Sequence, residues 1–212
     1  MKQEDTKNKI LDKALELFAT KGYEAVSVGE IAKAVGIKAP SLYNHYASKQ
    51  AIFDGIVESV SERYEQGTDK IDVHVDRAET DVGGYFGVSE DDIVKRLRNI
   101  FLYSLRDEKV KLFRKMMTIE QFRSAEIAAM YSKRYVERLV AYHALFFRKL
   151  TEAGELRAAP SEPLALMFVA PVITLLGICD RQPEREEECL KKLDEHARLF
   201  YRSFNLTAVD KM

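Results

Sequence analysis

The sequence predicts an all-α protein, and two observations carry that prediction. Apolar residues recur at intervals of three and four along most of the 212 residues, which is the spacing of one helix face. Glycine, proline and serine interrupt the pattern where helices would begin or end, and no stretch of useful length alternates as a strand does. With 46% hydrophobic residues, the chain can bury one large or two small cores.

The N-terminal segment predicts two helices with clear ends. Apolar residues between Ile10 and Phe18 share one helix face, and Gly22 follows as a left-handed stop. Ser27 and Glu30 have the spacing of a capping box, in which the hydroxyl and the carboxylate satisfy amides at the start of a helix. This second helix is short because Gly36 closes it.

Two further helices follow before the pattern changes. Pro40 suits the first turn of a short third helix, and Ser48 caps a longer fourth helix with an apolar stripe. Glycines and polar residues then interrupt the periodicity between Gly67 and Val88, so we place the domain joint there. The expected division is a domain of residues 1–48, a connecting helix of residues 49–67 and a larger helical domain of residues 68–212.

The larger domain also reads as helical throughout. Ser89 and Asp107 are expected to start successive helices, and a periodic segment from Ser124 to Ala153 predicts the longest helix. The segment Pro163–Cys179 carries no charge and approaches the length of a membrane span. Because Pro171 interrupts it, we interpret it as a helix surrounded by protein, with no membrane involved.

Composition limits the compartment and the partners. Thirty-three basic and 34 acidic residues give a net charge of −1, which excludes a polybasic protein. Residues 1–50 hold eight lysines and six acidic residues, a net +2, and the other 25 basic and 28 acidic residues give −3. Cys179 and Cys189 are too few for a Cys₄ zinc site, and no signal-peptide pattern is present. We therefore expect a cytoplasmic protein without a metal or cofactor.

The segment from Ser27 to Lys49 has the spacing of a helix-turn-helix. Ala32 leaves room for a second helix to cross closely, Gly36 takes the left-handed turn, and Leu42 fixes the second helix on the first. An ordinary helical hairpin would also use a small residue and a glycine. It would not need the polar and aromatic cluster of the second helix, so we favour DNA binding.

The residues of this segment resemble the tetracycline-repressor (TetR) family. The similarity is carried by Ser27-Val28-Gly29-Glu30-Ile31-Ala32-Lys33-Ala34-Val35-Gly36-Ile37, by Pro40-Ser41-Leu42-Tyr43-Asn44-His45-Tyr46 and by Ser48-Lys49, with Ala14 to Phe18 and Lys21 to Tyr23 upstream. It covers about the first 55 residues. The rest of the chain is similar to the family only in its helical character and its length.

A helix-turn-helix places the third helix in the major groove, where its first turn meets base edges. Ala39 and Pro40 offer apolar surface that suits a thymine methyl, whereas Ser41 and Asn44 can hydrogen-bond to bases or phosphates. The resemblance implies phosphate contacts by Tyr43, His45 and Lys49. The complete set of expected DNA-binding residues is Ser27, Lys38, Ala39, Pro40, Ser41, Tyr43, Asn44, His45 and Lys49.

Two positions depart from the family pattern. Lys38 stands where many relatives have a serine or threonine cap, so this helix end presents a cation in place of an acceptor. Gly29 stands where some relatives have an arginine that reads a base. Base recognition is therefore expected to depend on the third helix alone.

A single recognition helix reads too few base pairs for a unique site, so a homodimer is expected. The charge-free helix and the last helix would meet the same pair of a second chain in a four-helix bundle, as the resemblance also implies. The alternative is that both helices close the core of one chain. The expected dimer residues form the apolar seam of the last helix, namely Leu190, Leu193, Ala197, Phe200 and Phe204.

The resemblance implies a small-molecule effector bound in the C-terminal part. Aromatic residues and methionines there are compatible with a pocket, although each could equally be core. Arg98 could pair with an anionic effector or with a carboxylate of the chain, and His143 is expected in the core. The candidate effector residues are Arg98, Phe101, Met117, Phe122, Tyr131, Tyr135, Tyr142, Phe146 and Met167.

Together these features favour a dimeric, ligand-responsive repressor that binds palindromic operator DNA. An activator or constitutive DNA-binding protein without an effector remains the alternative. The sequence contains no G-x-S-x-G, H-E-x-x-H or phosphate-loop motif, so we expect no enzyme activity. A redox pair of Cys179 and Cys189 is a weaker hypothesis than two buried apolar residues.

Overall fold

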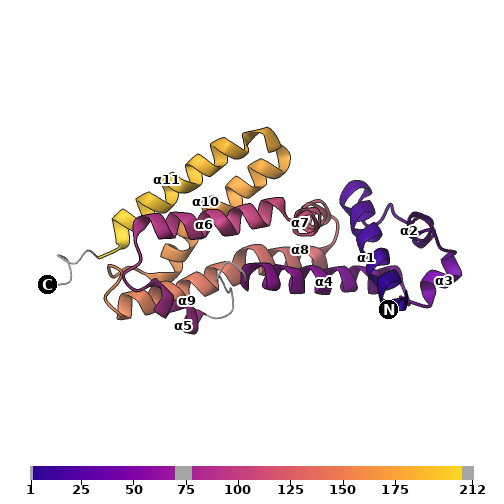
Figure 1. Ribbon diagram of the computed structural model, residues 1–212, viewed down its shortest axis with the longest axis horizontal. Coiled ribbons are helices and arrows are strands. Elements are labelled where there is room, and N and C mark those ends of the chain that lie inside the picture. Colours follow the sequence, from indigo (N-terminus) through magenta and orange to yellow (C-terminus); the bar gives the residue numbers. More distant parts are fainter. Residues whose placement is uncertain (1, 70–77, 207–212) are drawn as a thin grey trace. The chain divides into compact units, whose positions relative to one another are not determined.

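The structure is a computed structural model that describes residues 2–69 and 78–206 (Figure 1). Within these ranges the chain forms helices and no β-strand, which confirms the predicted all-α class. The helices are α1 (Lys2–Lys21), α2 (Val28–Val35), α3 (Ala39–Tyr43), α4 (Lys49–Asp69), α5 (Ala78–Asp81), α6 (Glu90–Arg106), α7 (Glu108–Glu120), α8 (Ala125–Ser132), α9 (Arg138–Glu152), α10 (Ser161–Arg181) and α11 (Glu186–Phe204). Short 3₁₀ turns span Val82–Tyr85 and Pro183–Arg185.

The chain divides into two compact units that do not follow the expected boundaries. The first unit contains Met1–Gln66 and Arg106–Tyr131, and the second contains Gly67–Leu105 and Ser132–Met212. Residues 106–131 were expected in the larger domain of residues 68–212. They belong to the first unit because α7 packs along α1.

Local signals set the ends of the first helices as predicted. Gly22 follows α1 with φ +87°, and Gly36 ends α2 with φ +82°. At the start of α2, the Ser27 hydroxyl accepts from the amide of Glu30 at 3.2 Å, and the Glu30 carboxylate accepts from the amide of Ser27 at 2.9 Å. The Ser27 amide, followed by the Lys21 side chain, lowers the pKa of Glu30 to about 2.

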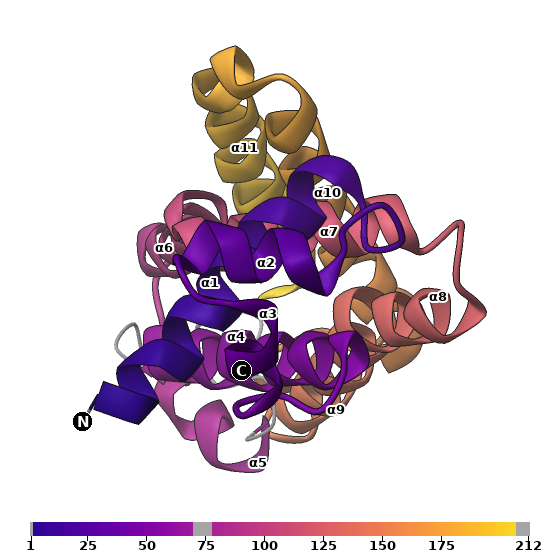
Figure 2. The same cartoon turned by 90° about the vertical axis from the view of Figure 1, so that its right-hand side faces the viewer.

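The core of the first unit joins α1, α4 and α7. Phe18, Tyr23 and Phe53 form a chain of edge-to-face rings with centroid separations of 5.0 and 5.4 Å. Phe113 and Met116 of α7 are completely buried. This aromatic packing joins α1 and α4, which lie behind α2 and α3 in the view of Figure 2.

The second unit is built around α6, α9, α10 and α11. α10 and α11 lie side by side, and a buried cluster joins them to α6 through Phe101, Leu193 and Cys179 (Figure 1). Cys179 and Cys189 are both buried and free, and their thiols are hydrogen-bonded to each other. Burial, reinforced by that bond, raises the pKa of Cys179 to about 12, which favours its protonated thiol near neutral pH.

The predicted long helix from Ser124 to Ala153 is interrupted. A π-helical turn spans Lys133–Glu137 between α8 and α9. Such a turn inserts an extra residue into the helical repeat, so side chains on either side of it do not share one face. Tyr142, Phe146 and Leu150 are accordingly buried, whereas Tyr131 and Tyr135 are only partly buried.

Protein of the same chain covers only part of the charge-free helix. α10 has the length and composition of a membrane-spanning helix, yet only 28% of its apolar 18-residue stretch is buried inside the chain. Leu166 and Met167 are 51% and 58% exposed. The helix packs on α9 and α11 with one face and leaves a second apolar face uncovered.

Candidate nucleic-acid interface

The turn between α2 and α3 places the predicted packing residues in the interior. Ala32 and Leu42 are 1% and 0% exposed, and Gly36 closes α2 with its amide directed to the carbonyls of Ala32 and Lys33. A Cβ atom at Gly36 would have no atom of the described residues within 4 Å, apart from its chain neighbours. The left-handed backbone, and not a lack of space, is therefore the reason for a glycine there.

The outer face of α3 is polar and accessible. Pro40, Ser41, Tyr43 and Asn44 are exposed, with Tyr43 at 53%, while Ala39 is partly buried. Lys38 precedes the helix with no side-chain capping bond, as expected, and its exposed ammonium has no ion-pair partner among the residues that the structure describes. α3 and the residues that flank it therefore offer hydroxyl, amide and ammonium groups to a ligand in solution.

Other residues near this surface are hydrogen-bonded or partly buried within the protein. Ser27 is exposed, but its hydroxyl belongs to the capping box of α2. His45 is partly buried, and within the described ranges its Nδ1 atom has no hydrogen-bond partner. Tyr46 is partly buried, and burial raises the pKa of its phenol.

Lys49 is held more firmly than the sequence suggested. Its Nζ atom donates to the carbonyl oxygens of Tyr23 at 3.0 Å and Val26 at 3.2 Å. It also lies 4.2 Å from the centre of the Tyr23 ring and 3.9 Å from the Glu24 carboxylate. The side chain is 23% exposed, so Lys49 is engaged with the loop between α1 and α2.

The sequence analysis missed Glu120, which acts on the same loop. Its carboxylate is 2% exposed and accepts from the amide of Tyr23 at 3.1 Å and from the guanidinium of Arg123 at 3.1 Å. Gly22 approaches this pair so closely that a Cβ atom there would lie 2.8 Å from Glu120 and 2.5 Å from Arg123. In the sequence, the one feature that points to this contact is an acidic residue at a position that the helical pattern predicts to be buried.

The segment that contains the helix-turn-helix matches a known protein family. Residues 10–56 match the model described as "Bacterial regulatory proteins, tetR family". The chain is 46% identical over 52 residues to IcaR, the negative transcriptional regulator of the biofilm operon icaADBC, from Staphylococcus aureus strain Newman. The alignment covers 24% of this chain and 28% of that relative. The chain thus matches little more than a quarter of the length of this curated relative.

Solved structures match over nearly the whole chain. A tetR-family regulator from Mesorhizobium loti is similar with a TM-score of 0.70 and 20% identity, covering 97% of this chain and 100% of that one. SmeT, the repressor of the Stenotrophomonas maltophilia efflux pump SmeDEF, is similar with a TM-score of 0.64 and 22% identity, covering 96% and 92%. At such identities the likeness shows the fold.

The family match covers residues 10–56, so it shows a tetR-family segment in the N-terminal part of the chain. The resemblance of the N-terminal residues is thereby confirmed. The likeness in fold extends over the second unit, where most of the remaining predicted residues lie.

The structure does not gather the candidate effector residues into one place. Met117 and Phe122 lie in the first unit, where Met117 is fully buried and Phe122 is 87% exposed. In the second unit, Phe101 is in the core and Met167 is on the uncovered face of α10. Tyr142 and Phe146 do come together as stacked rings, and the ring of Tyr85 meets that of Phe146 edge to face. Tyr131 and Tyr135 lie on either side of the boundary between the two units, and Arg98 pairs with Asp194 through a 2.8 Å contact.

The residues of the predicted dimer seam lie mostly inside the chain itself. Leu190, Leu193, Ala197 and Phe200 are buried inside the chain itself, against α6, α9 and α10. Phe204 is partly buried beside Phe200, with ring centroids 5.0 Å apart. The apolar stripe of the last helix is therefore covered by its own chain, and Leu199 on another face is 68% exposed.

Proposed function

We propose that the protein is a dimeric, ligand-responsive transcriptional repressor that binds palindromic operator DNA and is released by a small-molecule effector. The observation that carries the proposal is the accessible first turn of α3, which follows a capped α2 and a left-handed glycine. Tyr43, Ser41 and the unpaired Lys38 are available on that surface. IcaR, matched over the same segment, is named a negative transcriptional regulator, which supports repression.

The uncovered apolar face of the second unit supports the dimer. Leu166 and Met167 of α10 and Leu199 of α11 are each more than half exposed. A monomer in water would leave this surface solvated, whereas contact with a second copy would remove it from water. Each recognition helix would then read one half-site of a palindrome.

The effector is proposed on a narrower basis. One similar solved structure is a complex of SmeT with triclosan, which has a TM-score of 0.67 and 22% identity to this chain. In this protein, α4 runs without a break from Lys49 to Asp69 and so belongs to both units. A ligand that favours one setting of α4 would change operator affinity through linkage.

A mobility-shift titration on the upstream DNA, at two salt concentrations, tests the central claim. We expect tight, salt-dependent binding that Asn44→Ala weakens with a changed sequence preference, because its side chain is placed to meet bases. Sedimentation tests the dimer: Leu199→Glu should yield monomers, whereas Phe122→Glu, at an even more exposed site of the first unit, should not. Absence of specific binding to genome-wide DNA would overturn the proposal.

A further inference from the structure

The two cysteines of the chain lie against each other where α10 ends and α11 begins. Cys179 is in the last turn of α10, and Cys189 is in the first turn of α11. Both are 1% exposed and belong to one buried cluster, and their thiols are hydrogen-bonded to each other. They are the only cysteines in the sequence, so they form a pair of sulfur atoms without a competing thiol.

The surroundings of this pair are apolar. Leu175, Leu193 and Phe101 belong to the same buried cluster. Within residues 2–69 and 78–206, no group of three or more histidine, cysteine, aspartate or glutamate side chains could hold a metal ion. The pair therefore offers two sulfur donors without a set of oxygen or nitrogen donors. Such a site disfavours Mg²⁺, Ca²⁺ and four-coordinate Zn²⁺.

Two neighbouring sulfur atoms match the coordination of soft metal ions. Thiolate ligands select ions such as Cu(I), and both Cu(I) and Hg(II) accept two sulfur ligands in a linear arrangement. Binding requires that each thiol lose its proton to solvent while its sulfur forms a bond to the ion, so no oxidant or reductant is consumed. A divalent ion leaves a neutral complex, which an apolar site favours over the charged complex of a monovalent ion.

We propose that Cys179 and Cys189 form a two-coordinate binding site for a soft metal ion of the chemistry shared by Cu(I) and Hg(II). The bound ion would join the end of α10 to the start of α11 in place of the bond between the two thiols. Residues 182–184, which follow α10, are exposed. Terminal helical turns open more readily than helix interiors, which gives an ion access without unfolding of the core. The site does not depend on the proposed DNA binding.

An anaerobic titration of the reduced full chain with Cu(I), buffered by a chromophoric chelator, tests the site. We expect one ion per chain. Cys179→Ala and Cys189→Ala should each raise the Kd at least about a hundredfold, because the second of two linked contacts adds a factor of about 10²–10⁴ to the affinity. The cysteine-free double variant is the matched control, since it measures binding by the six methionines alone.

Hg(II) supplies a readout that needs no variant and so remains available if the alanine variants fail to fold. At about pH 6, where thiols are ordinarily protonated, one bound ion should release about two protons, whereas a methionine thioether has none to lose. One equivalent should also raise the thermal midpoint. Zn²⁺ should leave the midpoint unchanged, because two of its four ligands are missing.

Three results would overturn the inference. The first is Cu(I) binding by the cysteine-free variant that is as tight as binding by the wild type. The second is a stoichiometry of two ions per chain, which would show that each sulfur binds separately. The third is the lack of proton release on addition of Hg(II), which would show that the thiols do not bind the ion.

Discussion

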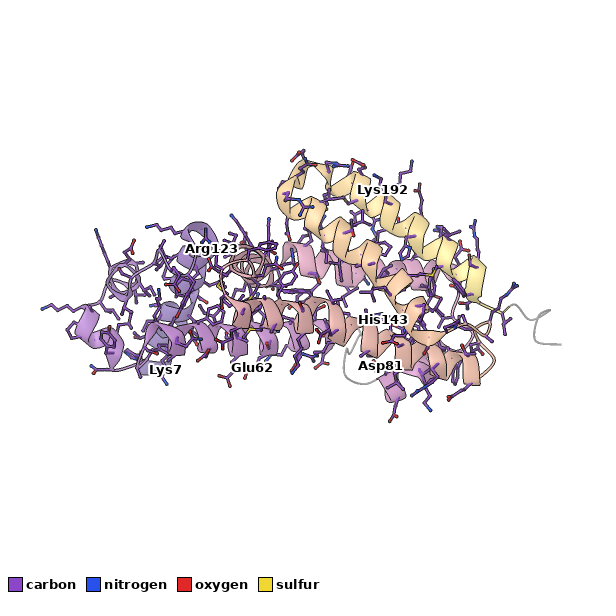
Figure 3. The ribbon with its side chains drawn as sticks, turned by 180° about the vertical axis from the view of Figure 1, so that it is seen from behind. Lys7, Glu62, Asp81, Arg123, His143 and Lys192 are labelled. Atoms are coloured by element: carbon purple, nitrogen blue, oxygen red, sulfur yellow. The ribbon has the colours of Figure 1, made fainter. Side chains whose placement is uncertain are left out.

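The phenol of Tyr142 on α9 donates a hydrogen bond to the carboxylate of Asp81 on α5 at 2.9 Å. Asp81 lies beside the helix that also carries His143 (Figure 3). Burial, followed by the bond to Asp81, raises the pKa of Tyr142 well above its ordinary value. This aromatic residue, a candidate effector contact from the sequence, is therefore already bound within its own unit.

Replacing Tyr142 with phenylalanine should lower the free energy of unfolding by about 1–3 kcal/mol, because the partly buried carboxylate of Asp81 loses a donor. Urea denaturation measures the change. Tyr85→Phe is the matched control, since Tyr85 packs on Phe146 at 4.7 Å and no phenol hydrogen bond is found for it among the described residues. Equal losses in both variants would contradict the assignment.

Acid should weaken the fold through His143 before the carboxylates titrate. Its Nδ1 atom lies 2.8 Å from the Leu139 carbonyl, and burial lowers the pKa of the ring to about 4. The unfolded chain takes up a proton below about pH 6.5, so stability present above that pH is lost as pH falls toward 4. We expect a loss of about 1–3 kcal/mol, measured by urea unfolding at pH 7, 5.5 and 4.5.

His143→Phe keeps the ring packing against Phe147 and Phe168 and should flatten this dependence. The titration of Glu90 does not account for a loss of stability in this pH range. Its bonds to Arg202 and Arg198 lower its pKa to about 2, so its contribution persists down to the ordinary carboxyl range and is lost only below it. An equally steep fall in His143→Phe would exclude His143 as the cause.

Two glycines with nearly the same backbone should respond differently to alanine. Gly22 and Gly36 have φ of +87° and +82°, so both substitutions carry a backbone penalty of about 1–2 kcal/mol. A Cβ atom at Gly36 meets nothing within 4 Å, whereas one at Gly22 meets Glu120 and Arg123. Gly22→Ala should therefore lower the thermal midpoint clearly more than Gly36→Ala does. Similar midpoints would show that the close approach does not matter.

Gly67→Ala should destabilise the protein although alanine favours helices. Gly67 lies near the end of α4, and a Cβ atom there would overlap the ring of Tyr103. Gly29→Ala is the control because its Cβ atom would meet only the Ser27 hydroxyl at 3.8 Å, so alanine should be neutral or up to about 1 kcal/mol stabilising. Denaturant unfolding measures the free energy of unfolding of both variants. Tyr103→Ala removes the overlapping ring, so Gly67→Ala should cost less stability in a protein that also carries Tyr103→Ala.

Features set by neighbouring residues were predictable from the sequence. The bonds between Ser27 and Glu30 span three positions, and the left-handed Gly36 follows directly from the end of α2. The exposed Tyr43 and the buried Leu42 follow from helical periodicity on α3. The helix-turn-helix could thus be placed residue by residue.

Contacts between distant positions were not predictable in this way. The stripe containing Leu193 shows that one helix face is buried, but periodicity does not tell which chain covers it. Lys49 meets Val26 and Tyr23 across the loop, and Tyr23 meets Glu120 from 97 positions away. The π turn at Lys133–Glu137 likewise leaves no signal in an apolar pattern that continues through it.

The packing around Gly22 also limits how related sequences can diverge. A side chain at position 22 is compatible with the fold only if the carboxylate at Glu120 or the guanidinium at Arg123 is shortened or lost. Substitutions at these three positions should therefore occur together during evolution. In an alignment of relatives, the pair Glu120 and Arg123 should accompany glycine at position 22 and disappear from lineages in which that glycine has been replaced.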